Sequence, residues 1–276
     1  MKELKLLSEG NGYIFTTRQI LPASRPTSLK FMSNFCLKAL TILLFVTTHV
    51  HGQYKTYFGL EGAITNDVSE IADYGNNFKN AIQIQSFWGF NVRQDLPGKI
   101  FLETSLIRKN HNTGYGVDGF PGSFGAGSIR SFIASLRLGT KINIHREKIY
   151  LVPVIGYSFG FNRDYSSFGY SASGYGSGGV NIGNDSFSYT ISERYNLAKN
   201  FSLLQTGLGF EFGIFKKAIL SVSANYFTGF QKISESDITY KINNSSPTTA
   251  KVYSKGEFWS LGIGFRYPIG DFWKKE

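Results

Sequence analysis

Histidine and cysteine are the residue types most suited to metal binding or nucleophilic catalysis, and this chain of 276 residues has few of them. Cys36 is the only cysteine, and His111 and His145 are the only histidines after His51. No cluster of carboxylates surrounds either histidine in the sequence, whereas a metal site needs three or four ligands. We therefore expect no metal, no cofactor and no catalytic residue among these positions.

Two glycine-rich stretches, 114–119 and 174–179, match the G-x-G-x-x-G pattern of dinucleotide-binding loops. That pattern binds a pyrophosphate only where it follows a strand and opens a helix within a βαβ unit. Neither stretch opens an amphipathic helical segment. We therefore interpret these glycines as loop residues and not as a nucleotide site.

The overall composition favours long β-strands over membrane helices. Apolar residues make up 42% of the chain, yet the mean hydropathy is −0.13 and charged residues are 17%. A bundle of transmembrane helices would have a strongly positive mean hydropathy, whereas alternating strands mix apolar and polar residues. Aromatic residues at 16% and 31 glycines suit strands and turns. From residue 53 onward there are 23 basic and 17 acidic residues, too mild an excess to predict nucleic-acid binding.

A secretory leader is indicated by the continuous apolar run at 39–50. The run is too short for a spanning helix, which takes about 20 residues, and Gly52 supplies a small residue for signal-peptidase cleavage. The residues before this leader are either an extension from a wrongly assigned start codon or a genuine long presequence. We expect an over-called extension at 1–31, a signal peptide at 32–52, and an outer-membrane barrel domain at 53–276.

Apolar and polar residues alternate with a period of two along most of the mature chain. In 81–93, for example, Ile84, Trp88 and Phe90 share one face, and Gln85 and Asn91 lie on the other. This alternation is the pattern of strands with one apolar face. It predicts an all-β chain with eight antiparallel strands at 54–64, 81–93, 99–109, 129–144, 149–162, 200–214, 217–230 and 257–269.

The connections between these strands alternate between long and short. Long loops with short turns are typical of an up-and-down transmembrane β-barrel, with the loops outside and both termini in the periplasm. A soluble β-sandwich is an alternative, and so is a ten-stranded barrel that adds Phe187–Tyr195 and 248–254. The expected long outer loops are 65–80, 110–128, 163–199 and 231–256.

The polar faces of the strands carry charges of both signs. In a barrel of eight strands the interior is only wide enough for side chains, and buried charges are tolerated when they are paired. We therefore predict a lumen filled by an ion-pair network of Glu61, Arg93, Glu103, Arg137, Lys141, Glu211 and Arg266. We expect the lipid-facing aromatic girdles to include Tyr54, Trp88, Trp259 and Tyr267.

The last hairpins repeat a short pattern, since Gly207–Phe212 (Gly-Leu-Gly-Phe-Glu-Phe) matches Gly262–Tyr267 (Gly-Ile-Gly-Phe-Arg-Tyr). With the leader and the terminal aromatic strand, this pattern resembles the small outer-membrane β-barrel family of Bacteroidota. That family includes PorT-like proteins and is similar in build to OmpA/OmpX-type barrels. The resemblance covers about 54–269 and implies an outer-membrane location. Residues 271–276 depart from it, because many such barrels end on an aromatic residue.

Three functions are compatible with such a barrel. The leading hypothesis is a structural or binding barrel, surrounded by outer-membrane lipid, whose loops 110–128, 163–199 and 231–256 contact an extracellular or envelope partner. The second is an enzyme that modifies outer-leaflet lipid, for which His111 lies near Asp118 and Ser123 in the sequence. The third is a small channel or transporter, which a charged and crowded lumen disfavours.

Overall fold

The computed structural model describes residues 55–117, 124–146, 148–163, 170–182, 185–214, 217–243 and 246–269. These residues form β-strands and their connections, together with one 3-10 turn at Pro97–Lys99. Among them, no helix has the length and apolar character required to cross a membrane. The expected leader and the expected girdle residue Tyr54 lie outside the described residues.

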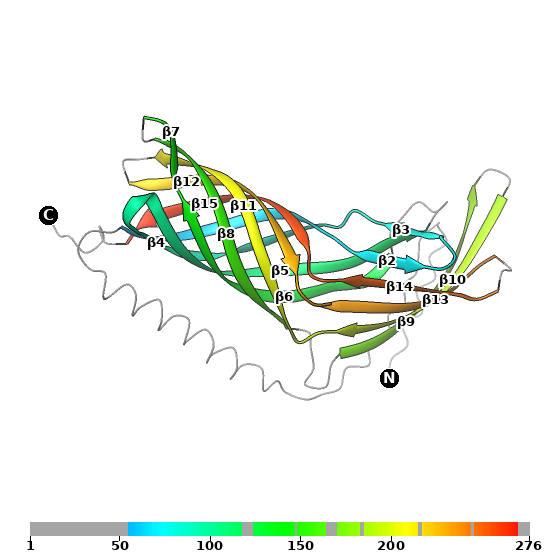
Figure 1. The fold of residues 1–276 in the computed structure, drawn as a ribbon. Helices are drawn as coiled ribbons and strands as arrows, with labels where there is room; N and C mark the ends of the chain where they lie inside the picture. The colour runs from blue at the N-terminus through cyan, green and yellow to red at the C-terminus, as the bar shows by residue number, and fades with distance from the viewer. Residues whose placement is uncertain are drawn as a thin grey trace, which may run out of the picture.

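Eight strands form a closed antiparallel barrel (Figure 1). Each strand pairs with its neighbours along the chain, β8 pairs with β11, and the last strand pairs with the first to close the ring. The predicted fold class and strand number are therefore confirmed. The barrel strands are β1 (Thr56–Asp67), β4 (Ile84–Asp95), β5 (Ile100–Val117), β6 (Phe124–Thr140), β8 (Ile149–Asn162), β11 (Asn200–Ile214), β12 (Ala218–Gly229) and β15 (Phe258–Pro268).

The long connections contain a second sheet beyond one end of the barrel, on the right in Figure 1. The two segments of the ten-stranded alternative, Phe187–Tyr195 and 248–254, belong to this sheet and not to the barrel wall, so that alternative is wrong. In order across the sheet, the strands are β2 (Glu70–Asp73), β14 (Thr248–Ser254), β13 (Ser234–Ile242), β10 (Asp185–Leu197) and β9 (Tyr170–Ile182). We call it the loop-end sheet.

Two short strands extend the barrel sheet at its ends. β3 (Phe78–Asn80) pairs with the loop end of β5, and β7 (Ile142–His145) pairs with β8 at the turn end. The expected loop at 110–128 is largely strand, because β5 and β6 remain paired as far as Tyr115 and Phe124 with one register shift after Asn112. Thr113, Gly114, Tyr115 and Gly116 are all buried there, so the alternation of buried and exposed positions ends at the register shift.

The barrel wall is apolar outside, and most of its charged side chains point inside. Ile263 on the outer face is 66% exposed, whereas the inward Arg93 is fully buried. A water-soluble sandwich would reverse this arrangement, so that alternative is wrong. An outer apolar band around a polar interior is the arrangement of transmembrane β-barrels, because lipid surrounds the wall and all backbone groups pair within the ring.

Apolar side chains pack in two places at the loop half of the molecule. One cluster fills the lumen, and a second lies between the loop-end sheet and the extension of β5. The lumen cluster consists of Phe87, Ile107, Ile133, Phe201, Leu203, Phe227, Ile233 and Phe258. The second consists of Tyr115, Ile238, Tyr240, Ala250 and Val252. The loop-end sheet is therefore packed against the barrel sheet at the extension of β5.

Inward glycines make room for large side chains in the lumen. The ring of Phe201, which is 1% exposed, lies where a Cβ on Gly160 would stand. We expect Gly160→Ala to lower the free energy of unfolding by about 1–3 kcal/mol, the usual cost of overpacking a filled core. Urea titration in lipid vesicles measures this loss.

Gly213→Ala is the matched control for that substitution. A Cβ on Gly213 would meet only the carbonyl oxygen of Lys148, at 3.9 Å. The free energy of unfolding of this variant should therefore lie within about 0.5 kcal/mol of the parent value. Equal losses in the two variants would contradict the steric explanation.

Candidate functional site

The lumen brings together all seven charged residues that the alternation placed on the inner face. They form one chain of contacts in which negative and positive side chains alternate, with Asp95 as an eighth member. From one end to the other the order is Glu61, Arg137, Glu103, Arg266, Glu211, Arg93, Asp95 and Lys141. We call this the lumen network.

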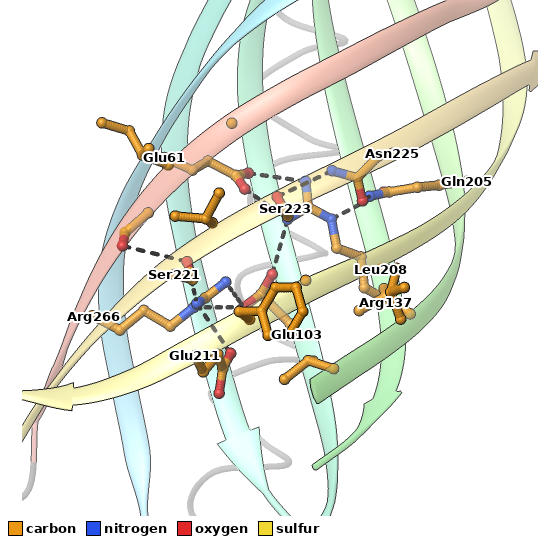
Figure 2. A pocket seen from close by; sticks show the side chains of 18 of the residues that line it. Glu61, Glu103, Arg137, Gln205, Leu208, Glu211, Ser221, Ser223, Asn225 and Arg266 are labelled. Atoms are coloured by element: carbon orange, nitrogen blue, oxygen red, sulfur yellow. Dashed lines mark hydrogen bonds and ion pairs between the residues drawn. The ribbon is translucent and has the colours of Figure 1, made fainter. Parts of the chain in front are cut away.

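Arg137 is the junction of the lumen network (Figure 2). Its two terminal nitrogens donate to both carboxylate oxygens of Glu61 at 2.7 and 2.9 Å. Nη1 also donates to Glu103 at 2.9 Å, and Nε donates to Gln205 at 3.0 Å. The guanidinium therefore joins β6 to β1, β5 and β11, and its planar fork suits these several acceptors better than an ammonium would.

Arg266 continues the network from β15, as Figure 2 shows. Its Nε donates to Glu103 Oε2 at 2.8 Å, and Nη1 lies 3.4 Å from Glu211 Oε1 and 3.1 Å from Ser221 Oγ. Glu211 also accepts from Arg93 Nη1 at 2.5 Å. The Arg93 guanidinium stacks on the ring of Phe101, 3.4 Å from its centre, so apolar as well as polar contacts hold this end.

Asp95 is the member that the strand alternation missed. It accepts from Arg93 Nε at 3.1 Å and from Lys141 Nζ at 2.7 Å. Asp95 stands two residues after the inward Arg93, and β4 extends to it, two residues beyond the predicted strand 81–93. The network thereby balances four cations against four carboxylates, which lets them remain charged in a narrow interior.

The space left inside the lumen network is small. One cavity of about 50 Å³ is lined by Glu61, Glu103, Arg137, Gln205, Glu211 and Arg266 together with wall residues. Pockets for small molecules usually measure about 300–1,000 Å³. The cavity can hold water, but neither an ordinary metabolite nor an open path fits within it. The apolar lumen cluster fills the next layer toward the loops.

A second buried charge pair lies above the apolar layer. Lys109 Nζ on β5 contacts Asp67 Oδ1 on β1 at 2.5 Å, and it donates to Thr65 Oγ1 at 3.3 Å and to the Asn110 carbonyl at 2.9 Å. Asp67 Oδ2 accepts the Asn112 backbone N–H at 2.8 Å. The strand alternation could have identified Lys109, because it follows the inward positions Glu103, Ser105 and Ile107.

His111 lies in a different place from the one expected. The sequence put it at the start of an outer loop, but it belongs to β5 and is only 2% exposed. Its ring contacts Phe201 and Phe258 edge to face, and Nδ1 is 4.0 Å from Asp67. It therefore faces the lumen, away from lipid. Asp118 and Ser123 lie outside the described residues.

The aromatic residues expected at the membrane borders differ in exposure. Trp88 and Trp259 project from the outer wall, 53% and 57% exposed, and Trp259 packs against Tyr226 with ring centres 4.6 Å apart. Tyr267 is only partly exposed. Ring-bearing residues at such positions suit the polar border of a bilayer, where an apolar body meets water.

The loop-end sheet presents paired charges on its outward face. Lys251 lies 3.1 Å from Asp237 and 3.8 Å from Glu235, across β14 and β13. Lys255 donates to Glu70 Oε1 at 2.7 Å, and the Tyr253 hydroxyl donates to the other oxygen of Glu70. The Glu70 contacts join two separate connections, and the Lys251 contacts join the two strands of one connection, so both help to hold the sheet in register.

The Glu70 carboxylate is the best pH reporter of the loop-end sheet. Hydrogen bonds from Lys255 and then from Tyr253 hold its pKa below the ordinary value of 4.5. Because the pKa is lowered in the folded state, this stabilisation is present above pH 4.5 and is lost as pH falls through the lower value. We expect Lys255→Gln to raise the pKa of Glu70, as measured by carbon NMR of the side-chain carboxyl. An unchanged titration would show that the contact does not persist in solution.

Metal-binding chemistry finds no support in the described ranges. No group of three or more His, Cys, Asp or Glu side chains there could hold a metal ion. The carboxylates of the lumen network are occupied by arginine and lysine side chains. Their arrangement serves charge neutralisation across the barrel.

Comparison with known proteins gives only distant likenesses. No protein-family model matches the chain, and no curated protein matches its sequence. Similar solved structures include a major outer membrane protein from Thermus thermophilus, 12% identical over 78% of this chain and 99% of that one, with a TM-score of 0.40. Neisserial surface protein A, from Neisseria, is 9% identical over 78% and 99%, with a TM-score of 0.39. Ail, the attachment invasion locus protein of Yersinia pestis, is 15% identical over 77% and 99%, with a TM-score of 0.34. The barrel assignment rests on the strand pairings of this chain.

Proposed function

We propose that this protein is an outer-membrane barrel with a structural or binding role, in which a closed barrel carries the loop-end sheet as a contact platform. The observation that carries the proposal is that five strands from three connections form one sheet packed on β5. A barrel that served only as an anchor would need no ordered sheet beyond the membrane. Such a sheet offers a fixed surface for adhesion, ligand capture or envelope assembly.

The proposed orientation places the loop-end sheet outside the cell and both termini in the periplasm. Short turns at one end and long connections at the other support this orientation, as does a leader at 32–52 ahead of a mature chain at 53–276. The Gly-x-Gly-aromatic repeat supports membership of a PorT-like group in Bacteroidota. In this orientation 110–128, 163–199 and 231–256 meet the partner.

The contact chemistry that these connections offer is adaptable. The segment Tyr170–Ile182, which forms β9, contains tyrosine, serine and glycine and has no charged residue. Tyrosine gives contact area at low entropic cost, and serine and glycine give backbone and hydroxyl hydrogen bonds. The paired charges on β13 and β14, on the other side of β10 from β9, add polar specificity to the same sheet. We propose an extracellular or envelope partner for this surface.

The barrel itself can be tested by heat-modifiable migration on SDS gels. A closed barrel should resist SDS until it is boiled, because opening it breaks the hydrogen bonds of whole strands together. We expect a mobility shift in the outer-membrane fraction. A soluble periplasmic product without a shift would sink the membrane assignment.

The binding role can be tested by deleting 165–185, which removes β9 from the edge of the loop-end sheet. Cells that display the deleted chain should lose attachment to arrays of immobilised glycans and matrix proteins. Lys99→Gln, an exposed position at the turn end, is the control and should attach like the parent. Unchanged attachment after the deletion would count against a contact role for this edge.

A channel would conduct ions across a planar bilayer, whereas the proposed barrel should not. The apolar lumen cluster and the 50 Å³ cavity leave no continuous aqueous path, so we expect no stepwise conductance from the intact protein. A porin added afterwards to the same bilayer shows that the membrane can report a pore. Stable nanosiemens-scale steps from this protein alone would favour the channel instead.

A further inference from the structure

His111 is a buried titratable residue that takes no part in the lumen network. It lies on β5 at the loop side of the apolar lumen cluster. Its ring packs edge to face on Phe201 of β11 and Phe258 of β15, with ring centres 5.5 and 5.8 Å away. Both phenyl rings belong to the apolar lumen cluster. The imidazole is therefore packed into the layer that closes the lumen toward the loops.

The surroundings of His111 suit the neutral imidazole and not its protonated form. Within the described residues, Nε2 has no hydrogen-bond partner. Charged groups approach the ring from β5, where Lys109 stands two residues away, and from β1, where Asp67 Oδ1 lies 4.0 Å from Nδ1. β11 and β15 contribute phenyl rings, and the residue paired with His111 on β6 is Ile129. Because Asp67 is already paired with Lys109, a proton on His111 would add a second buried cation beside one carboxylate.

The same part of β5 holds a segment that enters the lumen from the loops. Ile233, in the connection between β12 and β13, is fully buried and belongs to the apolar lumen cluster. Ser234, the first residue of β13, is hydrogen-bonded through Oγ to Thr113 Oγ1 at 2.7 Å. Thr113 stands two residues after His111, and both side chains are buried. We call Ile233 and Ser234 the stopper, since they hold the base of β13 against the lumen.

We propose that protonation of His111 releases the stopper, so that the contact between the loop-end sheet and the lumen is sensitive to acid. An imidazole in water takes up a proton near pH 6.5. An open lumen can hydrate the resulting charge and the closed lumen cannot, so the proton binds to the open form and a falling pH favours that form. Acid would then act at the base of the contact platform, which goes beyond the contact role proposed above and does not depend on the identity of the partner.

Release of the stopper would not turn the barrel into a channel. The lumen network fills the turn half of the barrel and leaves a cavity of about 50 Å³. Its arginine side chains stay charged at any pH at which the protein is folded, so the turn half remains closed. The expected result of the release is therefore exposure of buried residues near the stopper, without ion conductance.

Ser236 is a suitable reporter of this exposure. It lies on β13 two residues after Ser234, it is 1% exposed, and its Oγ has no hydrogen-bond partner among the described residues. Ser236→Cys therefore changes one atom, and the chain from residue 53 onward has no other cysteine. Maleimide labelling of the protein in lipid vesicles is counted on the peptide by mass spectrometry and divided by the rate in the urea-unfolded chain at the same pH. We expect this ratio to rise about tenfold from about pH 7.5 to about pH 5.5, the full shift for one proton taken up at the ordinary histidine value.

His145 supplies the matched control, because it is the other histidine after His51 and is exposed at the turn end. With Ser236→Cys as the reporter, the rise should persist in His145→Gln and vanish in His111→Gln. A labelling ratio that does not change with pH in the parent overturns the proposal. So does a rise that persists in His111→Gln, or one that vanishes equally in both histidine variants.

A second measurement does not require the His111 variant to fold. In His145→Gln, His111 is the one histidine left from residue 53 onward, so carbon NMR of the histidine ring follows its protonation alone. Proton uptake over the same pH range as the labelling rise supports the proposal, whereas either change without the other overturns it. The heat-dependent gel shift at neutral pH tests the barrel itself, so failure of the barrel and failure of the acid response are distinguishable.

Discussion

Replacing Arg137 by Met should lower the free energy of unfolding by about 3–5 kcal/mol, the cost of breaking a buried ion pair from one side. Glu61 would lose both of its hydrogen bonds from the guanidinium, and Glu103 would keep only Arg266. Two carboxylates would then face each other across a lumen that holds a cavity of about 50 Å³. Urea unfolding in lipid vesicles, followed by tryptophan fluorescence, measures the loss.

The compensated variant Arg137→Met with Glu61→Gln separates charge from packing. It removes one cation and one anion, and it leaves Glu103 paired with Arg266 at 2.8 Å. We expect it to recover most of the stability lost by the single variant, because no unpaired charge remains in the lumen. If the double variant is as unstable as Arg137→Met, the loss comes from packing, and the charge argument fails.

Replacing Asp67 by Ala should also lower the free energy of unfolding by about 3–5 kcal/mol, because Lys109 would be left as a buried and unpaired ammonium. The Lys109 side chain is fully buried, and Asp67 is its carboxylate partner. The Asn112 backbone N–H would lose its acceptor as well. The same urea titration, together with the temperature at which the gel shift occurs, reports this change.

The control for this second change removes both charges. Asp67→Leu with Lys109→Met replaces a buried pair by apolar side chains of similar size, which is often neutral or stabilising. The pair adjoins the apolar lumen cluster, and Lys109 already lies 4.5 Å from the ring centre of Phe258. A double variant that unfolds as easily as Asp67→Ala would show that the pair is needed for more than neutrality.

Most of the barrel could be predicted because its strands obey a local rule. Side chains alternate between lipid and lumen, so the residue types along a segment such as 257–269 are enough to identify β15 and its inward Arg266. The inward glutamates and arginines followed from the same rule. The rule states which face a residue occupies, and it needs no knowledge of the neighbouring strand.

The partners across the lumen could not be predicted in this way. Which inward residues meet depends on the stagger between strands, which the alternation within one strand does not contain. Arg137, for example, contacts Glu103 on the neighbouring strand β5 and also Glu61 on β1, which lies two strands further around the ring. The prediction missed Asp95 because it ended the strand at residue 93, whereas β4 continues to Asp95. It misplaced His111 because β5 continues into the expected loop. The loop-end sheet pairs segments far apart in the sequence.

The seam between β1 and β15 has a consequence for how the protein assembles. Eleven positions of β1, from Tyr57 to Asp67, pair with β15, from Pro268 back to Phe258. The first strand made must therefore wait for the last, and every shorter intermediate has two open edges that could pair with other chains. Closure is a single late event, so a chain that stops before residue 258 would be an open, aggregation-prone sheet and not a smaller barrel.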